Sequence, residues 1–245
     1  MRLRLQKYIA QSGICSRRAA EILIKDGKVL LNSSKLAQIG DSVDPNVDVV
    51  SVDGQVLRPK TKQYYIFNKP TKLLCSKKDS AGLLCLYNQL LPSMRHLNYA
   101  GRLDYMSEGL LILSNDGNFV NRLTHPSFNI QKRYQVSIKS IVDIDLFLKT
   151  ITNEGIKDDG EILKADSATI ISSKKGIYFL ELTLHEGKNR EIRRMINAFN
   201  GKVIRLIRVQ MGPFLLNDLK PGKWRAFNQR ELKFVKEISE TSVAS

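Results

Sequence analysis

Apolar positions follow two different patterns along the chain. Within the first sixty residues, two short segments place their apolar side chains on one helical face, and a glycine follows each segment. Ser16 stands where it can cap the second helix, and the turn Asp53-Gly54 joins two strand-like runs. The predicted elements are helices at 3–12 and 17–26, a strand at 28–32, and hairpin strands at 47–52 and 55–57. This order predicts a small helix-helix-hairpin domain over residues 1–60.

Residues 61–238 alternate strand-like and helix-like segments irregularly, with several short connections. The predicted strands are 64–70, 109–114, 132–138, 167–172, 177–187 and 202–212. The predicted helices are 82–92, 117–125, 142–151 and 189–200. This alternation favours an α+β domain with a mixed, mainly antiparallel sheet and flanking helices over a doubly wound sheet. A polar stretch with a proline at 58–63 predicts a linker, and the tail 239–245 is predicted to be disordered.

The composition is typical of a soluble globular protein, with 42% hydrophobic and 26% charged residues. No apolar stretch approaches the length of a membrane span, and the basic N-terminus lacks the apolar core of a signal peptide. We therefore expect a cytoplasmic protein without a membrane partner. Three cysteines without C-x-x-C spacing and three scattered histidines argue against a disulfide framework and a metal site.

The charge balance indicates a polyanionic partner. The chain has 39 Lys and Arg against 24 Asp and Glu, a formal net charge of +15. Residues 181–236 alone contain thirteen basic and five acidic side chains. A generally basic, solvated surface is the simpler alternative, and a membrane surface is a weaker one because no long amphipathic basic helix is evident. Since several of these charges lie beside predicted strands and a helix, nucleic acid is the favoured partner.

One carboxylate stands out once common catalytic motifs are excluded. The chain has no G-x-x-x-x-G-K-[ST], G-x-G-x-x-G or H-E-x-x-H motif, and no Ser/His/Asp set is evident. In the stretch GRLDYMSEGLLILSNDG, Arg102 and Asp104 come shortly before the apolar run of a predicted strand. From local spacing alone, an ion pair between these two side chains, or a turn role for Asp104, is the favoured interpretation.

Arginines make up most of the other candidates. In EGKNREIRRM, Asn189 is predicted to cap a helix whose first turns hold Arg190, Arg193 and Arg194. Arg190 and Arg193 are three residues apart and would share a face of that helix. A solvated basic face is the alternative interpretation.

Two further segments combine basic residues with a strand pattern. Their odd separation places Arg205 and Arg208 on opposite faces of one predicted strand, so at least one faces the core side or a cleft. Tyr134 follows Lys132 and Arg133 in KRYQV, where a core aromatic is the alternative interpretation.

Together these segments resemble the bacterial ribosomal-RNA pseudouridine synthases of the RsuA/RluB type. GRLDYMSEGLLILSNDG resembles the catalytic motif of that family, and NKP, KRYQV, EGKNREIRRM, RLIRVQMG and LKPGKWR fall in the family's order. The N-terminal segment MRLRLQKYIAQSGICSRRAAEILIKDGKV resembles an S4 RNA-binding domain. The resemblance covers about residues 1–230. The chain departs from the family pattern at Tyr105, Met106, Ser107 and Lys188, and at NSSK in the S4-like part, but not at Asp104.

The resemblance implies that a uridine of ribosomal RNA is isomerised to pseudouridine without a metal or cofactor. It implies Asp104 as the catalytic carboxylate, which either attacks C1′ or removes the C2′ proton; both alternatives remain open. Tyr134 would stack on the target base, Arg193 would pair with Asp104, and Arg102 would replace the extruded nucleotide or hold its phosphate. A carboxylate suits the positive charge that builds at C1′, and a nearby arginine keeps that carboxylate ionised.

The implied partner is ribosomal RNA or an assembling ribosomal subunit, and we expect the protein to bind it as a monomer. GKNREIRRM looks closer to the large-subunit enzymes, which favours 23S over 16S RNA. The basic side chains proposed to contact RNA are Arg2, Lys7, Arg17, Arg18, Lys28, Lys69, Lys132, Lys188, Arg190, Arg194, Arg205 and Arg208. A non-catalytic RNA-binding or ribosome-assembly factor with the same fold is the alternative function. An RNA methyltransferase is a more remote one, because no glycine-rich cofactor loop is evident.

Overall fold

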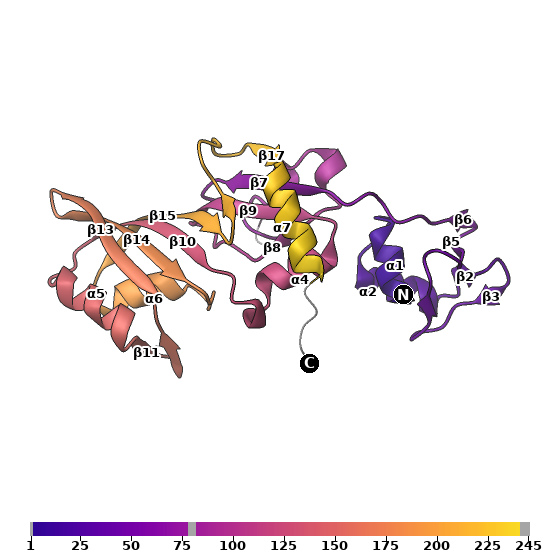
Figure 1. Cartoon of the computed structure of the whole chain (residues 1–245), viewed down its shortest axis with the longest axis horizontal. Coiled ribbons are helices and arrows are strands. Elements are labelled where there is room, and N and C mark those ends of the chain that lie inside the picture. The colour runs from indigo at the N-terminus through magenta and orange to yellow at the C-terminus, as the bar shows by residue number, and fades with distance from the viewer. Residues whose placement is uncertain (1, 78–81, 241–245) are drawn as a thin grey trace. The chain divides into compact units, whose positions relative to one another are not determined.

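The computed structural model describes residues 2–77 and 82–240, and the chain divides into two compact units, residues 1–63 and 64–245 (Figure 1). The fold is α+β with mainly antiparallel sheets, as the sequence predicts. Of the predicted disordered tail, residues 239 and 240 are the end of a helix instead, and residues 241–245 lie outside the described residues.

The N-terminal unit packs two short helices, α1 (Leu5–Gln11) and α2 (Arg17–Lys25), on small antiparallel sheets. The Ser16 hydroxyl accepts a hydrogen bond from the Ala19 N–H and so caps α2, as predicted. The helix predicted from residue 3 begins at Leu5, because β1 (Leu3–Arg4) pairs with β4 (Ser42–Val43). The other strands, in spatial order, are β3 (Lys35–Leu36), β2 (Val29–Leu31), β5 (Val50–Val52) and β6 (Gln55–Val56).

A long mixed sheet forms the frame of the second unit. Its main path runs β13 (Ser167–Lys174), β14 (Ile177–Leu184), β10 (Lys132–Lys139), β15 (Lys202–Met211), β9 (Glu108–Ser114), β7 (Tyr64–Lys69) and β17 (Trp224–Ala226). Strand β8 (Asn98–Ala100) also pairs with β9, and β16 (Phe214–Leu215) with β15. Neighbouring strands are antiparallel except for β9 and β15. A separate hairpin consists of β11 (Ile156–Asp158) and β12 (Glu161–Leu163).

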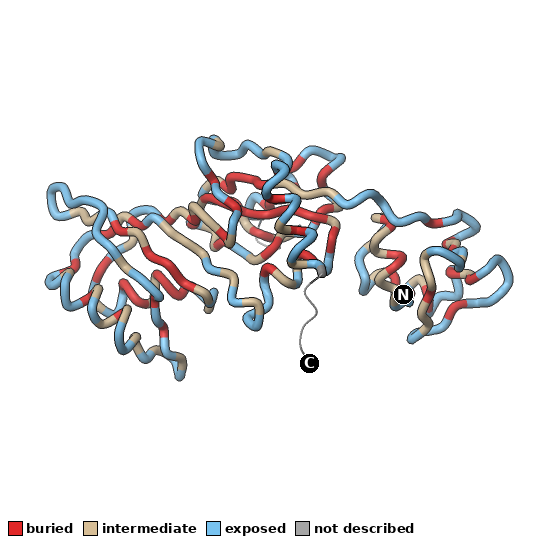
Figure 2. Tube along the Cα trace, in the orientation of Figure 1, coloured by how far each residue is buried: buried red, intermediate tan, exposed pale blue. Residues whose placement is uncertain are grey.

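Helices cover this sheet around separate buried cores (Figure 2). On the β10, β14 and β15 half, α5 (Ile144–Asn153) and α6 (Glu191–Ala198) contribute buried side chains such as Phe147 and Met195. On the β7 and β9 half, α4 (Gly117–Thr124) and α7 (Gln229–Glu240) contribute Phe119 and Val235. The other face of β7 and β9 is covered by a segment that includes α3 (Leu86–Gln89).

Strand β9 is buried on both of its faces. Leu110 and Ile112 belong to the core under α4, whereas Leu111 and Leu113 belong to the core on the opposite face. A strand covered on both faces needs apolar side chains at every position rather than at alternate ones. This arrangement explains the uninterrupted apolar run that follows Asp104 in the sequence.

The two halves of the sheet meet where β9 and β15 pair in parallel. The register is short, with Ile207 opposite Glu108 and Arg208 opposite Gly109. Gly109 has φ +106, and a Cβ at this position would lie 2.3 Å from the Arg208 carbonyl oxygen. Only glycine therefore allows the two backbones to approach this closely.

The helix predicted over 82–92 is mostly wrong. The segment begins extended, because Leu74 N–H donates to the Leu84 carbonyl and Leu86 N–H donates to the Leu74 carbonyl, both across a parallel bridge. A single helical turn, α3, follows, and Pro92 begins a 3-10 turn that ends at Met94. These pairings with a segment ten residues away cannot be deduced from the local pattern. The local pattern also did not predict α7 or the short strands β1, β3, β4, β8, β11, β12, β16 and β17.

Replacing Gly109 by alanine should destabilise the fold by about 3 kcal/mol or more, because the new Cβ meets backbone and the φ angle is unfavourable. Gly117→Ala is the matched control, since Gly117 is helical and a Cβ there meets nothing within 4 Å. We expect Gly117→Ala to be neutral or slightly stabilising. Denaturant unfolding measures both variants, and equal stabilities would contradict the close approach of β9 and β15.

Candidate active site

Asp104 lies in a tight turn between β8 and β9. Its carbonyl accepts a hydrogen bond from the Ser107 N–H at 3.0 Å, and the neighbouring Leu103 is buried in the core. The Asp104 side chain stays 34% exposed and lines an open pocket. The turn therefore fixes the backbone while it leaves the carboxylate accessible.

The ion-pair partner of Asp104 is Arg193 of α6, whose Nε lies 3.8 Å from the carboxylate Oδ2. Arg193 Nη2 also donates to the Met106 carbonyl at 3.1 Å and to the Ser107 hydroxyl at 3.3 Å. Burial lowers the pKa of Arg193, and the Asp104 charge opposes that shift. The guanidinium remains charged at neutral pH and attracts the carboxylate. Local spacing favoured Arg102 as the partner of Asp104, so the tertiary contact replaces that interpretation.

Lys69, at the end of β7, holds the backbone of the same turn. Its side chain is 0% exposed. Its ammonium donates to the carbonyls of Ser107 at 2.7 Å, Pro70 at 3.0 Å, Asp104 at 3.1 Å and Tyr105 at 3.5 Å. Burial lowers the pKa of Lys69 to about 8. The prediction that Lys69 contacts RNA is therefore wrong, because a fully buried ammonium bonded to carbonyls cannot reach a phosphate.

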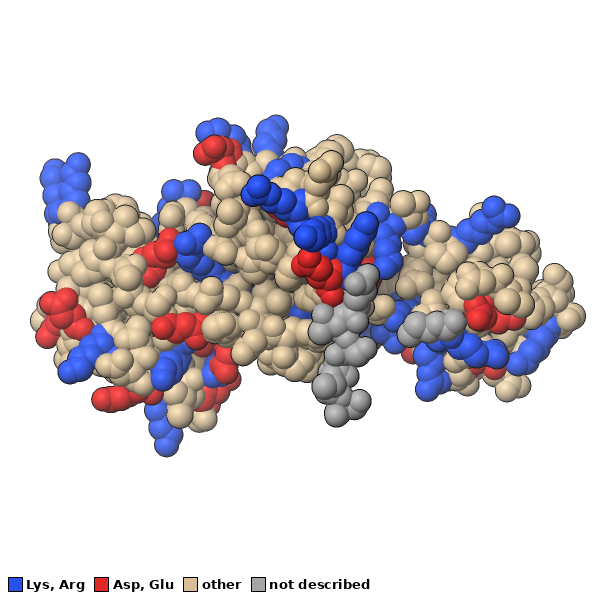
Figure 3. All heavy atoms as spheres, viewed as in Figure 1, with Lys and Arg blue, Asp and Glu red and all other residues tan. Residues whose placement is uncertain are grey.

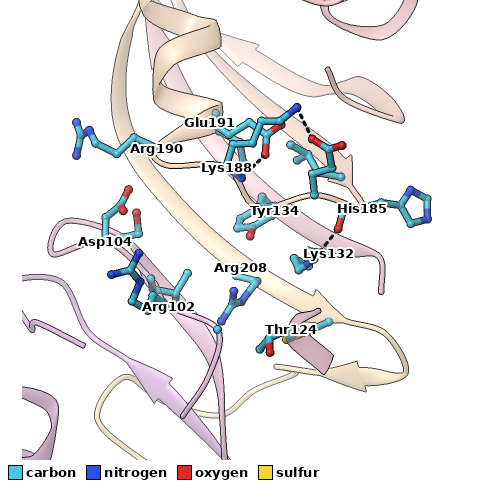
Figure 4. A pocket seen from close by; sticks show the side chains of 18 of the residues that line it. Arg102, Asp104, Thr124, Lys132, Tyr134, His185, Lys188, Arg190, Glu191 and Arg208 are labelled. Carbon is cyan, nitrogen blue, oxygen red and sulfur yellow. Dashed lines mark hydrogen bonds and ion pairs between the residues drawn. The ribbon is translucent and has the colours of Figure 1, made fainter. Parts of the chain in front are cut away.

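The pocket beside this turn has a volume of about 420 Å³ (Figure 4). Figure 4 shows Tyr134 near its middle, with Asp104 on one side and Lys132 on the other. Tyr134 is partly buried against two cores, which fixes the ring in the pocket wall. Lys132 Nζ donates to the His185 and Ile130 carbonyls at 2.6 and 2.9 Å, and burial lowers the pKa of Lys132. Lys132 thereby ties the start of β10 to the neighbouring loop.

The loop before α6 forms another wall of the pocket. Arg190 precedes the helix in a left-handed conformation with φ +50, and its exposed side chain lines the pocket. The predicted cap at Asn189 is wrong, because the helix begins at Glu191 and the Glu191 carboxylate accepts from the Lys188 N–H at 3.1 Å. Lys188 lines the pocket too, and its ammonium donates to the Ile162 carbonyl and pairs with Glu186.

The two arginines of β15 lie on opposite faces, as their spacing predicts. Arg208 is opposite Tyr134 on β10 and lines the pocket. Arg205 is opposite Ser137, and its guanidinium makes two hydrogen bonds to Glu108, at 2.8 and 2.9 Å, away from the pocket.

Arg194 also points away from the pocket. Its guanidinium donates to the Asp158 and Glu161 carboxylates, each at 2.5 Å, and so attaches the β11–β12 hairpin to α6. The carboxylate partners of Arg194 and Arg205 argue against the predicted RNA contacts of these two side chains. The predicted basic side chains that line the pocket are Arg102, Lys132, Lys188, Arg190 and Arg208.

The predicted RNA-binding side chains of the N-terminal unit lie on its surface. Arg2, Arg17, Arg18 and Lys28 are exposed, and Lys7 is partly buried. In the view of Figure 3, basic side chains are spread over both units with acidic ones among them rather than gathered in a single patch. The N-terminal unit therefore presents separate cations that can contact phosphates.

Sequence reasoning missed several side chains at the pocket. His185 Nδ1 lies 2.7 Å from the Asp166 carboxylate, and Thr124 and His125 line the side next to Arg102. The buried Glu191 carboxyl also lines the pocket, and burial raises the pKa of Glu191. These residues come from separate segments, and no local spacing in the sequence indicated that they meet.

Both units of the chain match known protein families. Residues 63–198 match the family described as RNA pseudouridylate synthase, and residues 3–49 match the S4 domain. The chain belongs to the RNA pseudouridylate synthase family. Both parts of the resemblance seen in the sequence are thereby confirmed.

Full-length relatives show the same combination of units. An uncharacterized RNA pseudouridine synthase of Aquifex aeolicus is 38% identical, covering 95% of this chain and 93% of the relative. The ribosomal large subunit pseudouridine synthase B of Bacillus subtilis is 34% identical, covering 97% of each chain. A crystal structure of a pseudouridylate synthase matches with a TM-score of 0.65 and 28% identity, over 95% of this chain and 99% of that one.

Within residues 2–77 and 82–240, no three His, Cys, Asp or Glu side chains come close enough to hold a metal ion. No helix in this part of the synthase is long and apolar enough to span a membrane.

Lys69→Met should lower the unfolding free energy by about 2–4 kcal/mol, because three carbonyls of the turn and that of Pro70 lose their donor. We expect the catalytic rate to fall by about 100-fold as the Asp104 turn loosens. Lys233→Met is the matched control, since the Lys233 side chain is 80% exposed on α7. Denaturant unfolding and turnover measure the two effects, and an undiminished rate in Lys69→Met would contradict the role of Lys69.

The same pair of proteins tests the pKa of Lys69. Its folded-state pKa of about 8 lies below the ordinary value of 10.5, so between these pH values the unfolded chain binds more protons than the folded one. The wild-type protein should therefore gain stability relative to Lys69→Met as pH rises from 8 to about 10. A stability difference that does not change over this range would show that burial does not lower the Lys69 pKa.

Proposed function

We propose that this protein isomerises a uridine of ribosomal RNA to pseudouridine, with Asp104 as the catalytic group and no cofactor. Membership of the RNA pseudouridylate synthase family supports the reaction, and the name of the Bacillus subtilis relative favours large-subunit RNA as the substrate. The observation that carries the proposal is the ion pair of an accessible Asp104 with Arg193 at a pocket walled by Tyr134. We expect the protein to act as a cytoplasmic monomer on 23S RNA or an assembling subunit.

The pocket suits a nucleotide that has left its stack. Extruding a base costs a few kcal/mol, and stacking on an aromatic ring offsets about 1–3 kcal/mol of that cost. Tyr134 provides such a ring, and the exposed cations Arg102 and Arg190 line the same pocket, where they can hold the phosphates on either side. Arg102 can also enter the space that the nucleotide leaves.

The chemistry then requires one ionised carboxylate. When the N1–C1′ bond breaks, its electron pair stays on the base, and positive charge builds at C1′. Asp104 either attacks C1′ or removes the C2′ proton. The base then turns and C5 bonds to C1′. At that step the Asp104–C1′ bond breaks, or the C2′ proton returns to the sugar, depending on which route Asp104 takes. The C5 proton is lost and N1 gains a proton, so the product is an isomer of the substrate. Arg193 pairs with Asp104, and Lys69 fixes the turn, so the carboxylate is held in position before the substrate arrives.

Asp104→Asn should reduce pseudouridine formation to background, because the amide can neither attack C1′ nor accept the C2′ proton. RNA affinity should persist or rise slightly, since the cations remain. Asp159→Asn is the matched control: Asp159 lies in the β11–β12 turn with φ +47, a conformation that asparagine also tolerates. Nucleoside analysis and RNA titration on the same preparations measure both effects. Near-normal turnover in a folded Asp104→Asn protein would overturn the assignment and favour the non-catalytic alternative.

Removing residues 1–63 should weaken RNA binding and flatten its dependence on salt, because Arg2, Arg17, Arg18 and Lys28 no longer release counterions. Slow turnover should persist at high enzyme concentration, since the pocket belongs to the second unit. The slope of log affinity against log salt concentration is the measurement. A slope equal to that of the full chain would refute the binding role of the N-terminal unit.

A further inference from the structure

Arg208 is a buried cation with almost no partners. Its side chain is 2% exposed, and Nε donates to the Leu110 carbonyl at 2.8 Å. Nη2 is buried and has no hydrogen-bond partner among the residues that the structure describes. Within the same described ranges, no carboxylate lies at ion-pair distance from Arg208. A buried charge without a partner costs several kcal/mol, which indicates a ligand rather than a structural role.

The other arginines near the site differ from Arg208. Arg193, Arg194 and Arg205 each face a carboxylate, at distances between 2.5 and 3.8 Å. Two further cations, Lys69 and Lys132, are close enough for Arg208 to contribute to the lowering of their pKa values, whereas carboxylates such as Asp104 and Glu191 act on the two lysines in the opposite direction. Arg208 differs from both lysines in that its Nη2 has no hydrogen-bond partner among the described residues.

The position of Arg208 in the sheet brings it next to the place where the base of the substrate would bind. On β15 it is the cross-strand partner of Tyr134, and on its other side it is opposite Gly109 of β9. Directly opposite side chains on one face of a sheet lie about 5 Å apart at Cβ. Figure 4 shows Arg208 beside Tyr134, with Asp104 and Arg102 further toward the opposite side. A base stacked on Tyr134, with its C1′ toward Asp104, lies next to the Arg208 guanidinium.

We propose that Arg208 is a catalytic residue that stabilises the departing uracil by donating from Nη2 to one of its carbonyl oxygens. This inference rests on the proposed function. When the N1–C1′ bond breaks, both electrons remain on N1 and spread onto O2 and O4, and no proton is needed on the leaving base. The negative charge is the same whether Asp104 attacks C1′ or takes the C2′ proton. The negative charge on the base lasts until C5 bonds to C1′.

A cation at this place favours the transition state over the substrate. Uridine carries no charge on its base, so Arg208 binds it only as a hydrogen-bond donor. The developing uracil anion gains a full charge-assisted hydrogen bond from a guanidinium that is itself shielded from water. Such an interaction raises the rate of the chemical step more than it raises affinity. A phosphate is the less suitable ligand, because the exposed Arg102 and Arg190 provide for phosphates at the open side of the pocket.

The experiment compares Arg208→Met and Arg208→Lys with wild type on two RNA fragments, one with uridine and one with 5-fluorouridine at the target position. Single-turnover loss of the target nucleoside gives the rate of bond cleavage, and titration gives the affinity. Fluorine withdraws electrons and stabilises the departing anion. Loss or weakening of the Arg208 charge should therefore lower the rate of bond cleavage less for 5-fluorouridine than for uridine. Arg230→Met is the matched control, because Arg230 is an exposed arginine of α7 outside the pocket.

For Arg208→Met on uridine RNA we expect a rate loss of about 100- to 1000-fold, with affinity within about threefold of wild type. The loss on 5-fluorouridine RNA should be at least about tenfold smaller, and Arg208→Lys should recover at least about tenfold in rate because it keeps the charge. Equal losses on both bases, or an unchanged rate, would overturn the assignment. If Arg208→Met does not fold, the rate losses on uridine and 5-fluorouridine RNA are compared for Arg208→Lys instead, and equal losses would again overturn the assignment. A wild-type protein that forms no pseudouridine would refute the proposed function itself, so the two failures are distinguishable.

Discussion

The close parallel contact of β9 with β15 is the constraint on which the rest of the second unit depends. Only two residue pairs form it, and Gly109 makes it possible because any side chain there would meet the Arg208 backbone. This contact joins two half-sheets that otherwise have separate cores. It also brings the turn that carries Asp104 next to the strand that carries Arg208. The pocket lies at this junction and is lined by residues of both halves.

Electrostatics at this junction combine one accessible carboxylate with several restrained cations. Lys69 is fully buried, and its cost of desolvation is offset by carbonyls of the turn that it fixes. Arg193 is offset by Asp104 itself. Arg208 has no such partner. For this reason we propose that it stabilises the negative charge that the departing uracil carries only during the reaction. The three cations thus differ in task although all lie at the same junction.

Binding and chemistry are divided between the two units. The N-terminal unit has its own core and presents exposed cations, but the pocket and its carboxylate belong entirely to the second unit. Affinity that arises from separate phosphate contacts depends on salt, whereas the chemical step depends on the position of a few side chains. This division separates the many exposed cations that can contact RNA from the few side chains on which the chemical step depends.

The sequence by itself determined the elements whose pattern is local. Ser16 and Gly27 bound a helix, the apolar run after Asp104 is a buried strand, and the odd separation of Arg205 and Arg208 places them on opposite faces. The family motifs identified the reaction class for the same reason, since they are short and contiguous.

Only the tertiary structure decided which charges meet. Asp104 pairs with Arg193, as the family resemblance implied, whereas local spacing favoured Arg102, and Lys69 is buried under the turn rather than exposed to RNA. The extended pairing of Leu74 with the segment before α3 likewise overrode a helical pattern. Each of these outcomes depends on residues far apart in the chain, and burial decides whether a cation binds a carbonyl, a carboxylate or a ligand. A linear pattern of residue types does not contain that information, because it specifies neither the partner nor the depth at which the two meet.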